Sequence, residues 1–390
     1  MYFKGYRRVD GTIGIRNKIL VISVDECMEG IARSIAGSIT DSIVLTNYNT
    51  CMMGGNEETV NNLINIGCNP NVSGVLVLAM GCGSIDPKII ADPIMKMGKT
   101  AYTLTSIKEN GTRSTIAKGI KFAKILEQEK DNVEKVSAHI SELIVGVKCG
   151  GSDTSSGLAS NPSVGAAVDS LINMGGTAIA GELMELVGCE EVLVDRAISK
   201  EVGDKILRLV SEEERRWAVG GITEIMSVGN SVGGLTTIEE KAQGSLLKTG
   251  TTPIINILEF NQNGHEKPDS PGLYLSDTTM LCGGSATHFA AVGAQLILWT
   301  SGGAGFNNQL IPVIRVSGNE NLISEDIDID ATGVMNGADT VDNVAKRIVD
   351  KVVAVADGEC TQIEDVGYAY CTLYQKDTRL EYVLNSCSQV

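Results

Sequence analysis

Apolar runs of strand length that alternate with helix-like segments constrain this chain more than any other feature of its sequence. The first such runs are KILVISV (Lys18–Val24), SIVLT (Ser42–Thr46), GVLVLAM (Gly74–Met80) and ELIVGV (Glu142–Val147). Further runs lie at Thr177–Ala180, Pro253–Leu258, Leu273–Ser276, Gln295–Thr300 and Pro312–Val316. Strands that alternate with helices build parallel sheets. We therefore expect an α/β fold with two α/β domains, residues 1–138 and 139–390, and an active-site crevice at the strand C-terminal ends.

Between these runs lie segments with helical patterns. They are Met28–Ile39, Glu57–Ile66, the largely polar stretch from Ile107 to about Val136, Pro162–Met174, Lys200–Trp217, Thr236–Leu247 and Asp342–Val355. The clearest signals flank Pro162–Met174. Asn161 is predicted to cap this helix, Pro162 suits its first turn, and two glycines end it.

The charge balance excludes two classes of partner. The chain has 390 residues and a formal net charge of -16, so nucleic acid and anionic membranes would be repelled. A small anionic substrate needs only a local positive pocket. No apolar run approaches the roughly 18 residues of a membrane helix. The first residues contain no signal-peptide core, so we expect a cytoplasmic protein.

Ten cysteines are spread so widely that no two lie closer than eleven positions. In a cytoplasmic protein they are expected to be reduced thiols or metal ligands. Four of them, Cys27, Cys51, Cys82 and Cys149, each lie just past a predicted strand and shortly before a glycine. If the strands are parallel neighbours, these thiols face one crevice, where thiolates suit an iron–sulfur cluster or a single iron or zinc. The alternative is that they are small buried apolar residues, and Cys282 is a reserve candidate.

The stretch CGGSDTSSGLASNPS (Cys149–Ser163) offers backbone N–H groups, several hydroxyls and then a helix N-terminus. These groups suit a carboxylate or a hydroxyl-rich substrate. Asp153 is its one ionisable group besides the thiol. A plain surface turn is the alternative interpretation of this composition.

Two further segments hold candidate residues. Glycine-rich GNSVGGL leads from Asn230 into a helix on which Lys241 and Lys248 lie seven residues apart, and therefore on one face. They could neutralise a substrate carboxylate, although solvation is the expectation for most lysines. Glu182 follows a predicted strand, where it could act as a base or bind a metal, or simply begin a helix.

Three long motifs resemble those of the altronate and galactarate dehydratase family. They are GYRRVDGTIGIRNKILVISVDEC, the stretch CGGSDTSSG to GELMELVGCE, and GNSVGGLTTIEEKAQGSLLKTGTTPI. The resemblance implies an iron-dependent lyase (Fe²⁺ or a 4Fe-4S cluster) that removes water from a sugar acid to give a 2-keto-3-deoxy acid. The large subunit of (2R)-sulfolactate sulfo-lyase is similar too, which gives sulfite release with pyruvate formation as an alternative. A non-catalytic metal-binding scaffold is a further alternative.

The resemblance also implies roles for matching positions. Proton transfer is assigned to Glu182, Asp153 or Lys241, with a histidine of a partner subunit as rival. Substrate binding is assigned to Arg16, Asn17, Gly150, Gly151, Ser152 and Asn230. Metal binding is assigned to Cys51, Cys82 and Cys149, with Cys27 as a fourth candidate. The chain begins at the GYRR motif, so the resemblance implies a separate small SAF-type subunit, and the pair is expected to form a homo-oligomer. One departure is Gly303, which stands where sugar-acid dehydratases usually have an arginine, a natural partner for a carboxylate.

Overall fold

The computed structural model describes residues 1–48, 57–83, 85–219, 226–261, 264–278, 282–302, 308, 310–364, 366 and 372–373. Its N-terminal part is built on a four-stranded parallel sheet in the order β4-β3-β5-β6. The strands are β3 (Lys18–Ser23), β4 (Ser42–Thr46), β5 (Val72–Ala79) and β6 (Thr100–Thr105). The chain order reverses between β3 and β5, where open α/β sheets place their ligand crevices.

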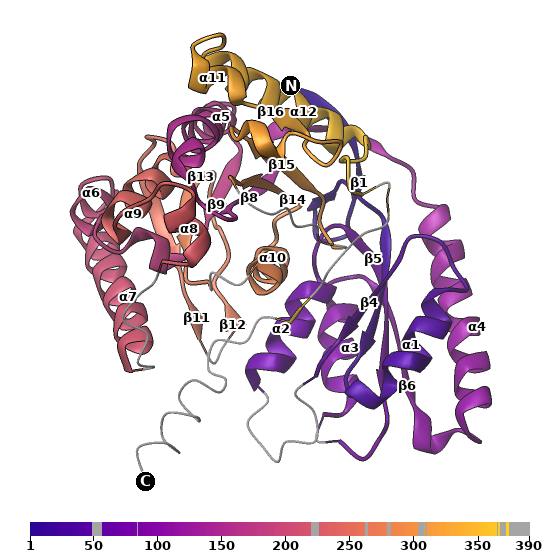
Figure 1. Cartoon of the computed structure of the whole chain (residues 1–390). Helices are drawn as coiled ribbons and strands as arrows, with labels where there is room; N and C mark the ends of the chain where they lie inside the picture. The colour runs from indigo at the N-terminus through magenta and orange to yellow at the C-terminus, as the bar shows by residue number, and fades with distance from the viewer. Residues whose placement is uncertain are drawn as a thin grey trace.

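Helices cover both faces of this sheet (Figure 1). They are α1 (Glu29–Ala36), α4 (Thr112–Asp131), α2 (Glu57–Gly67) and α3 (Pro87–Lys96). Alternation along β3 explains the two layers, because successive side chains of a strand point to opposite faces. Ile19 and Val21 pack with α1 and α4, and Leu20 and Ile22 pack with α2 and α3.

The second part is built on a seven-stranded parallel sheet in the order β10-β13-β9-β8-β14-β15-β16. Its strands are β8 (Ile144–Cys149), β9 (Thr177–Ala180), β10 (Ile254–Leu258), β13 (Gly272–Ser276), β14 (Leu296–Thr300), β15 (Val313–Ser317) and β16 (Ile329–Asp330). The helices α5 (Asn161–Asn173), α7 (Lys200–Val219) and α12 (Val341–Asp357) share a hydrophobic core with one face of the sheet.

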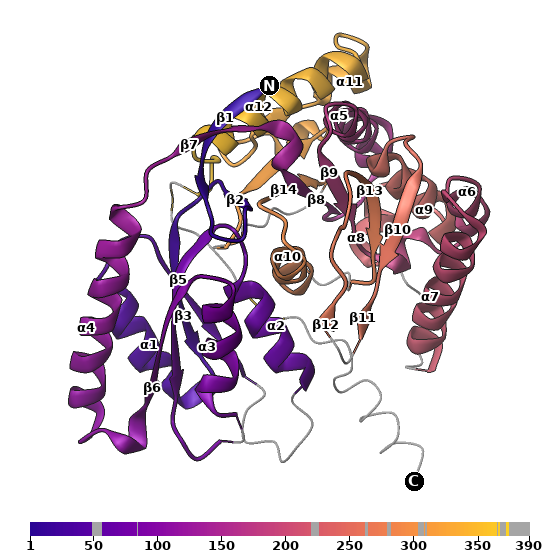
Figure 2. The same cartoon turned by 180° about the vertical axis from the view of Figure 1, so that it is seen from behind.

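The two sheets share a further core around helix α10 (Cys282–Ala291). Figures 1 and 2 show this helix between the two sheets, with α2 beside it. Its Phe289 belongs to one buried cluster with Leu63 of α2 and Trp299 of β14. The α/β class and the parallel sheets expected from the sequence are therefore confirmed, while the domain boundary after residue 138 stays a prediction.

Buried side-chain amides form hydrogen bonds between the two parts. Asn69 donates to the carbonyls of Ala290 and Ala294, at 2.8 and 2.9 Å. Asn71 donates to the carbonyl of Gln295, at 2.8 Å, and accepts from the backbone N–H of Ile15. Because buried polar groups are costly unless paired, these bonds fix the relative position of the sheets.

The remaining elements are short, and several escaped the sequence analysis. They are β1 (Tyr2–Arg7), β2 (Ile13–Gly14), β7 (Val136–His139), β11 (Phe260–Asn261), β12 (Gly264–His265), α6 (Glu190–Asp195), α8 (Val228–Val232), α9 (Ile238–Leu246) and α11 (Thr332–Asn336). Strands β1, β2 and β7 form a small antiparallel sheet. No helix in the described part of the chain is long and apolar enough to cross a membrane.

One local prediction was wrong. Asn161 does not cap α5; the N-cap is Ser160, and Asn161 is the first helical residue. The reason is that a π-helical turn, Ser156–Ser160, runs directly into α5. The Asn161 side chain is therefore released from capping, and donates instead to the carbonyl of Gly244, at 2.9 Å. Pro162 lies in the first turn, as predicted.

Candidate active site

The loop that follows β8 holds the residues of the CGGSDTSSG stretch in a fixed arrangement. The backbone N–H of Gly150 donates to Thr300 of the neighbouring strand, at 2.6 Å, and Gly151 accepts from the N–H of Gly302, at 2.9 Å. A side chain at position 150 would come within 2.7 Å of the Trp299 indole. The Cys149 sulfur lies 3.1 Å from the Ser152 hydroxyl. The expected alternative of a plain surface turn does not describe this loop, because Cys149 and Ser152 are both buried.

Behind the loop lies a buried cluster of charged side chains. The ammonium group of Lys148 pairs with the carboxylate of Glu182 and donates to the carbonyl of Cys149. The other carboxylate oxygen of Glu182 accepts from the backbone N–H of Cys149, at 3.1 Å. Lys248 lies 2.7 Å from Glu185 and 3.4 Å from Glu182. Each charge is therefore compensated, as buried ions require.

Lys241 completes the cluster from helix α9. Its ammonium nitrogen lies 3.6 Å from the Glu185 carboxylate. The prediction that such lysines are solvated was wrong, since Lys248 is 0% and Lys241 only 7% exposed. With all groups ionised, the three lysines (Lys148, Lys241, Lys248) exceed the two glutamates by one positive charge. This excess favours an anion beside the cluster.

Glu182 has an unusual backbone. Strand β9 ends at Ala180, and after Gly181 the chain turns so that Glu182 adopts a left-handed conformation with φ of 71°. A non-glycine residue in this region is strained. Glu182 begins the 3-10 turn Leu183–Leu186, but its side chain does not cap that turn. The strained backbone instead directs the carboxylate back toward β8.

The environment separates the pKa values of the two glutamates. Burial and the neighbouring carboxylate of Glu185 raise the pKa of Glu182, in spite of the two ammonium groups that it meets. Burial acts in the same direction on Glu185, but Lys248 and Lys241 outweigh it and lower its pKa to about 2. Burial also raises the pKa of the Cys149 thiol. Two carboxylates whose pKa values are driven apart are typical of catalytic sites.

Asp153 and Asn230 hold the loop in place. One carboxylate oxygen of Asp153 accepts from the Ser155 hydroxyl and the Ser156 N–H, both at 2.8 Å; the other accepts from Asn319, at 2.9 Å. Asn230, on α8, donates to the carbonyl of Ser152, at 2.9 Å. Both predicted residues therefore lie at this loop.

A cavity of about 360 Å³ opens beside the cluster, and we call it the Lys241 cavity. Its lining includes Ser152, Asp153, Asn161, Lys241 and Ser245, together with three leucines, Leu158, Leu235 and Leu247. Glu182 and Cys149 are not among the lining residues. The wall connects to the cluster through the Lys241–Glu185 contact and the Ser152–Cys149 contact.

The predicted cysteines do not follow strands of one sheet. Cys27 and Cys82 are exposed and follow β3 and β5, which are neighbours in the four-stranded sheet, whereas Cys149 ends β8 of the other sheet. Cys51 lies outside the described residues. Among the residues that are described, no three His, Cys, Asp or Glu side chains are arranged to hold a metal ion. These residues alone do not complete an iron site, which stays a prediction.

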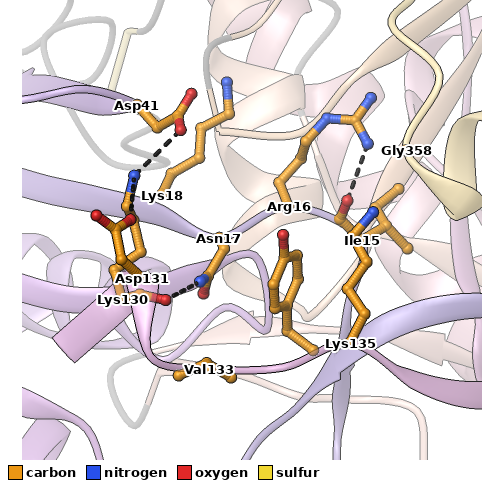
Figure 3. A pocket seen from close by; sticks show the side chains of 11 residues that line it. Ile15, Arg16, Asn17, Lys18, Asp41, Lys130, Asp131, Val133, Lys135 and Gly358 are labelled. Carbon is orange, nitrogen blue, oxygen red and sulfur yellow. Dashed lines mark hydrogen bonds and ion pairs between the residues drawn. The ribbon is translucent and has the colours of Figure 1, made fainter. Parts of the chain in front are cut away.

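Arg16 and Asn17 lie at a different cavity, of about 440 Å³ (Figure 3). The guanidinium of Arg16 pairs with Glu364 at 2.7 Å and donates to three backbone carbonyls. Asn17 donates to the carbonyl of Lys130, at 2.9 Å. We call this the Arg16 cavity; none of its lining residues lines the Lys241 cavity. The structure therefore does not bring Arg16 and Asn17 to the other predicted residues.

The sequence analysis did not identify several residues of the site. Lys148 had a usable signal, because a lysine at the end of an otherwise apolar strand requires a buried partner. Glu185 and the pairing of Lys248 had no such signal, since both depend on how α9 and the 3-10 turn Leu247–Thr249 lie against the turn after β9. Asn161 was assigned to a helix cap, whereas it lines the Lys241 cavity.

Two protein-family models match this chain. Residues 5–131 match the family model described as D-galactarate dehydratase/altronate hydrolase, second domain. Residues 140–378 match D-galactarate/altronate dehydratase, C-terminal. The Lys241 cavity lies within the second of these ranges.

Individual proteins from this group are similar to most of the chain. The (2R)-sulfolactate sulfo-lyase subunit beta of Chromohalobacter salexigens is 31% identical over 377 residues, covering 94% of this chain and 95% of that protein. The altronate dehydratase of Bacillus subtilis is 27% identical, covering 97% of this chain and 78% of that protein. The galactarate dehydratase (L-threo-forming) of Escherichia coli is 27% identical, covering 93% and 74%. All three are lyases by name. This chain belongs to the D-galactarate/altronate dehydratase family.

Proposed function

We propose that this chain is the lyase subunit that removes the C2 proton of a 2-hydroxycarboxylic acid and expels the group on C3. The C2–H electron pair forms the new C2–C3 double bond as the leaving group departs with its own bonding pair. The resulting enol then becomes a 2-keto acid. The observation that carries the proposal is Lys241, which lines the Lys241 cavity while its ammonium group is tied only loosely, at 3.6 Å, to the cluster behind it.

In this proposal Lys241 holds the substrate carboxylate. Its other N–H groups form no hydrogen bond with the described residues, and the cluster carries one surplus positive charge next to the cavity. Positive charge fixed beside a carboxylate also stabilises the enolate that develops when the C2 proton leaves. Lys148 and Lys248 pair with the glutamates of the cluster but do not line the cavity.

Asp153 is the base that we favour among the three predicted residues. It lines the cavity, whereas Glu182 lies behind the loop and is engaged by Lys148, Lys248 and a backbone N–H. The Asp153 carboxylate is oriented by three hydrogen bonds, which leaves lone-pair capacity for one more proton donor. Glu182 then acts as a positioning residue for Cys149 and the loop.

Water from a sugar acid is the first candidate for the leaving group, because the matching family models describe dehydratases. Sulfite from sulfolactate is the second candidate. It is favoured by a specific observation, the alignment with the sulfo-lyase subunit over nearly the whole of both chains. The reaction differs only at C3, so the same base and carboxylate holder serve either substrate.

Iron and a small second subunit belong to this proposal as well. Iron would polarise the leaving group or the enolate oxygen, but the described residues do not complete its site, so no step above depends on it. The sulfo-lyase relative is named as a subunit beta, which supports a multi-subunit enzyme. Elemental analysis of the anaerobically purified protein for iron and zinc would check the first expectation, and co-purification the second.

The experiment that tests the proposal uses protein purified anaerobically from its own cells, so that any metal and second subunit stay bound. Altronate, galactarate and sulfolactate are each incubated in D₂O. Release of 2-keto acid, release of sulfite and exchange of the C2 proton are followed separately. The expected result is C2 exchange and keto-acid formation with one of the three. No exchange and no product with any of them would overturn the proposal in favour of a non-catalytic scaffold.

Two variants assign the roles. Asp153→Asn is expected to lower C2 exchange at least about 100-fold, because general base catalysis is worth 10²–10⁴-fold. Glu240→Gln is the matched control, since Glu240 also lines the cavity but its carboxylate is bound by Thr236. Loss of exchange in the control alone would overturn the assignment of Asp153.

A further inference from the structure

Asp153 is held by three loops that follow neighbouring strands. Strands β8, β14 and β15 lie side by side and parallel in the larger sheet, so their C-terminal ends meet at one edge (Figure 1). The loop after β8 carries Asp153, the loop after β14 carries Gly302, and the loop after β15 carries Asn319. The contacts between these loops therefore decide how the Asp153 carboxylate lies at the Lys241 cavity, which it lines.

Gly302 lies directly against the Asp153 carboxyl group. A Cβ atom at position 302 would stand 1.9 Å from both Cγ and Oδ1 of Asp153, far inside van der Waals contact. Only glycine permits so close an approach of the backbone. The N–H of Gly302 donates to the carbonyl of Gly151, at 2.9 Å, and this bond ties the glycine to the loop after β8. The carboxyl group therefore has no room to move toward the loop after β14.

Asn319 holds the same carboxylate through its side-chain amide. Its Nδ2 atom donates to Asp153 Oδ2, at 2.9 Å, and to the carbonyl of Gly302, at 2.8 Å. Its Oδ1 atom accepts from the backbone N–H of Asn321, at 3.0 Å. A carbonyl can only accept and a backbone N–H can only donate, so the partners at both ends give the amide one orientation. The nitrogen of Asn319 must therefore face Asp153.

The hydrogen bonds of Asp153 are shared unequally between its two carboxylate oxygens. Oδ1 accepts twice, from the Ser155 hydroxyl and from the Ser156 N–H, whereas Oδ2 accepts once, from Asn319. Each carboxylate oxygen has two lone pairs. Counted over the described residues, the unused lone pair of this carboxylate is therefore on Oδ2. Asn319 orients the one oxygen that can still take a proton.

We propose that Asn319 is a positioning residue, which fixes Oδ2 of Asp153 in place for removal of the C2 proton. The inference rests on the proposed function, because it takes Asp153 as the base. Asn319 is not among the residues that line the Lys241 cavity, so it acts through Asp153 and does not bind the substrate. A base must lie within hydrogen-bond reach of the proton that it removes. A misplacement of about 1 Å is enough to cost about 100-fold in rate.

The alternative role of Asn319 is structural, because its Oδ1 atom caps the 3-10 turn Glu320–Leu322. Asn319→Asp separates the two roles. Aspartate caps as well as asparagine does, so the bond to the Asn321 N–H is kept. The donor that faces Asp153 is replaced by a carboxylate oxygen, and two neighbouring carboxylates repel each other. A capping role predicts full activity for this variant, and a positioning role predicts its loss.

The experiment measures C2 exchange in D₂O with anaerobically purified protein. The acid is whichever of altronate, galactarate and sulfolactate the unaltered protein exchanges. Binding of the same acid is measured by calorimetry, and the midpoint of a urea titration reports folding. We expect Asn319→Asp to lower the exchange rate at saturating acid about 100-fold, while the dissociation constant changes by less than about twofold.

A second variant and a matched control complete the set. Asn319→Ser also keeps a cap and adds no charge, but its shorter side chain lacks the amide donor, so exchange should fall about tenfold. Asn336→Asp is the control, because Asn336 likewise accepts from a backbone N–H two residues along, that of Ala338, at 3.0 Å. The control should exchange and bind the acid as the unaltered protein does.

The outcomes separate this inference from the proposed function. Full exchange in a folded Asn319→Asp protein, with Asp153→Asn inactive, overturns the positioning role and leaves the proposed function standing. If Asn319→Asp does not fold, full exchange in Asn319→Ser has the same meaning. Exchange that persists in Asp153→Asn overturns the base assignment and this inference together. Loss of exchange with retained binding in the Asn319 variants, and not in the control, supports the positioning role.

Discussion

The Lys241 cavity and the Arg16 cavity both carry basic side chains, but they differ in how their polar groups are paired. At the Arg16 cavity Arg16 meets Glu364, Lys130 meets Asp41 and Lys135 meets the carbonyl of Asp357, while Lys18 lies 3.7 Å from Glu364. At the Lys241 cavity the lining residues keep a loosely held ammonium group and two buried atoms that are unpaired among the described residues, Asn161 Oδ1 and Ser245 Oγ. The unpaired buried atoms, and not the loosely held ammonium group, therefore distinguish the Lys241 cavity from the Arg16 cavity.

The difference separates polar residues that stabilise the fold from polar residues that keep unused hydrogen-bonding capacity at a cavity. Arg16 ties the N-terminal segment to the end of α12, through the carbonyl of Val355 and the loop that carries Glu364. The cluster behind Lys241 is equally well paired at Lys148 and Lys248, so only its cavity-facing edge is unsatisfied. Pairing, and not charge or burial, is therefore the property that separates the two cavities.

The largest expected effect comes from breaking the paired part of the cluster. Lys248→Met leaves Glu185 without its closest cation and Glu182 without its second, both fully buried. We expect the free energy of unfolding to fall by about 3–5 kcal/mol, measured by urea titration. The matched control is Lys346→Met, whose partner Asp350 lies on an exposed helix face, and it should cost no more than about 0.5 kcal/mol. Equal losses would show that the cluster is not a buried network.

Arg16→Met tests the other cavity. The substitution removes the ion pair with Glu364 and three hydrogen bonds to backbone carbonyls. The free energy of unfolding should therefore fall by about 2–3 kcal/mol. Acid binding at the Lys241 cavity should be unchanged, as measured by calorimetry on folded protein. If the variant stays folded and loses acid binding, the comparison fails and Arg16 regains the substrate-binding role expected from the family resemblance.

The next prediction concerns Glu185 in the buried cluster and the pH dependence of the free energy of unfolding. Lys248 and Lys241 outweigh the effect of burial and lower the pKa of Glu185 from 4.5 to about 2. A lowered pKa means that the folded state binds the proton less readily than the unfolded state. The stabilisation by Glu185 is therefore present above pH 4.5 and is lost as the pH falls toward 2.

Glu185→Gln should remove this contribution. Between pH 4.5 and pH 3 the unaltered protein should lose up to about 1.4 kcal/mol per pH unit more than the variant, since one proton is involved. Urea titrations at a series of pH values measure the two slopes, and other carboxylates cancel in the difference. Parallel slopes would mean that Glu185 is not held ionised by the lysines.

Much of the fold was predictable because apolar runs of strand length form buried strands in an α/β chain. The predicted run Thr177–Ala180 coincides with β9, and Ser42–Thr46 coincides with β4. Strand β6, TAYTLT, was missed because it is half exposed and lacks an apolar run, and α3 contains Pro93 in its interior. These elements form because neighbouring strands and helices cover them, which local patterns do not record.

The site was predictable only in part, for a related reason. Ser152 and Asp153 were identified from small residues after a strand, and Lys241 from a helix that follows a glycine-rich segment; all three line one cavity. The strands that precede Cys27, Cys51 and Cys82 are parallel neighbours, as assumed, but the strand of Cys149 belongs to the other sheet. Which sheet a strand joins is decided by packing around α10, far away in the sequence.

The smallest expected effect is a pair of serine substitutions that tests pairing directly. Ser155 is buried and donates to Asp153 at 2.8 Å, while Ser245 is buried and its hydroxyl is unpaired. Ser155→Ala should cost about 1 kcal/mol of unfolding free energy, and Ser245→Ala close to none, because no protein hydrogen bond is lost. Both are measured by urea titration without ligand. A loss at Ser245 as large as at Ser155 would mean that its hydroxyl has a structural partner, and the two cavities would no longer differ in kind.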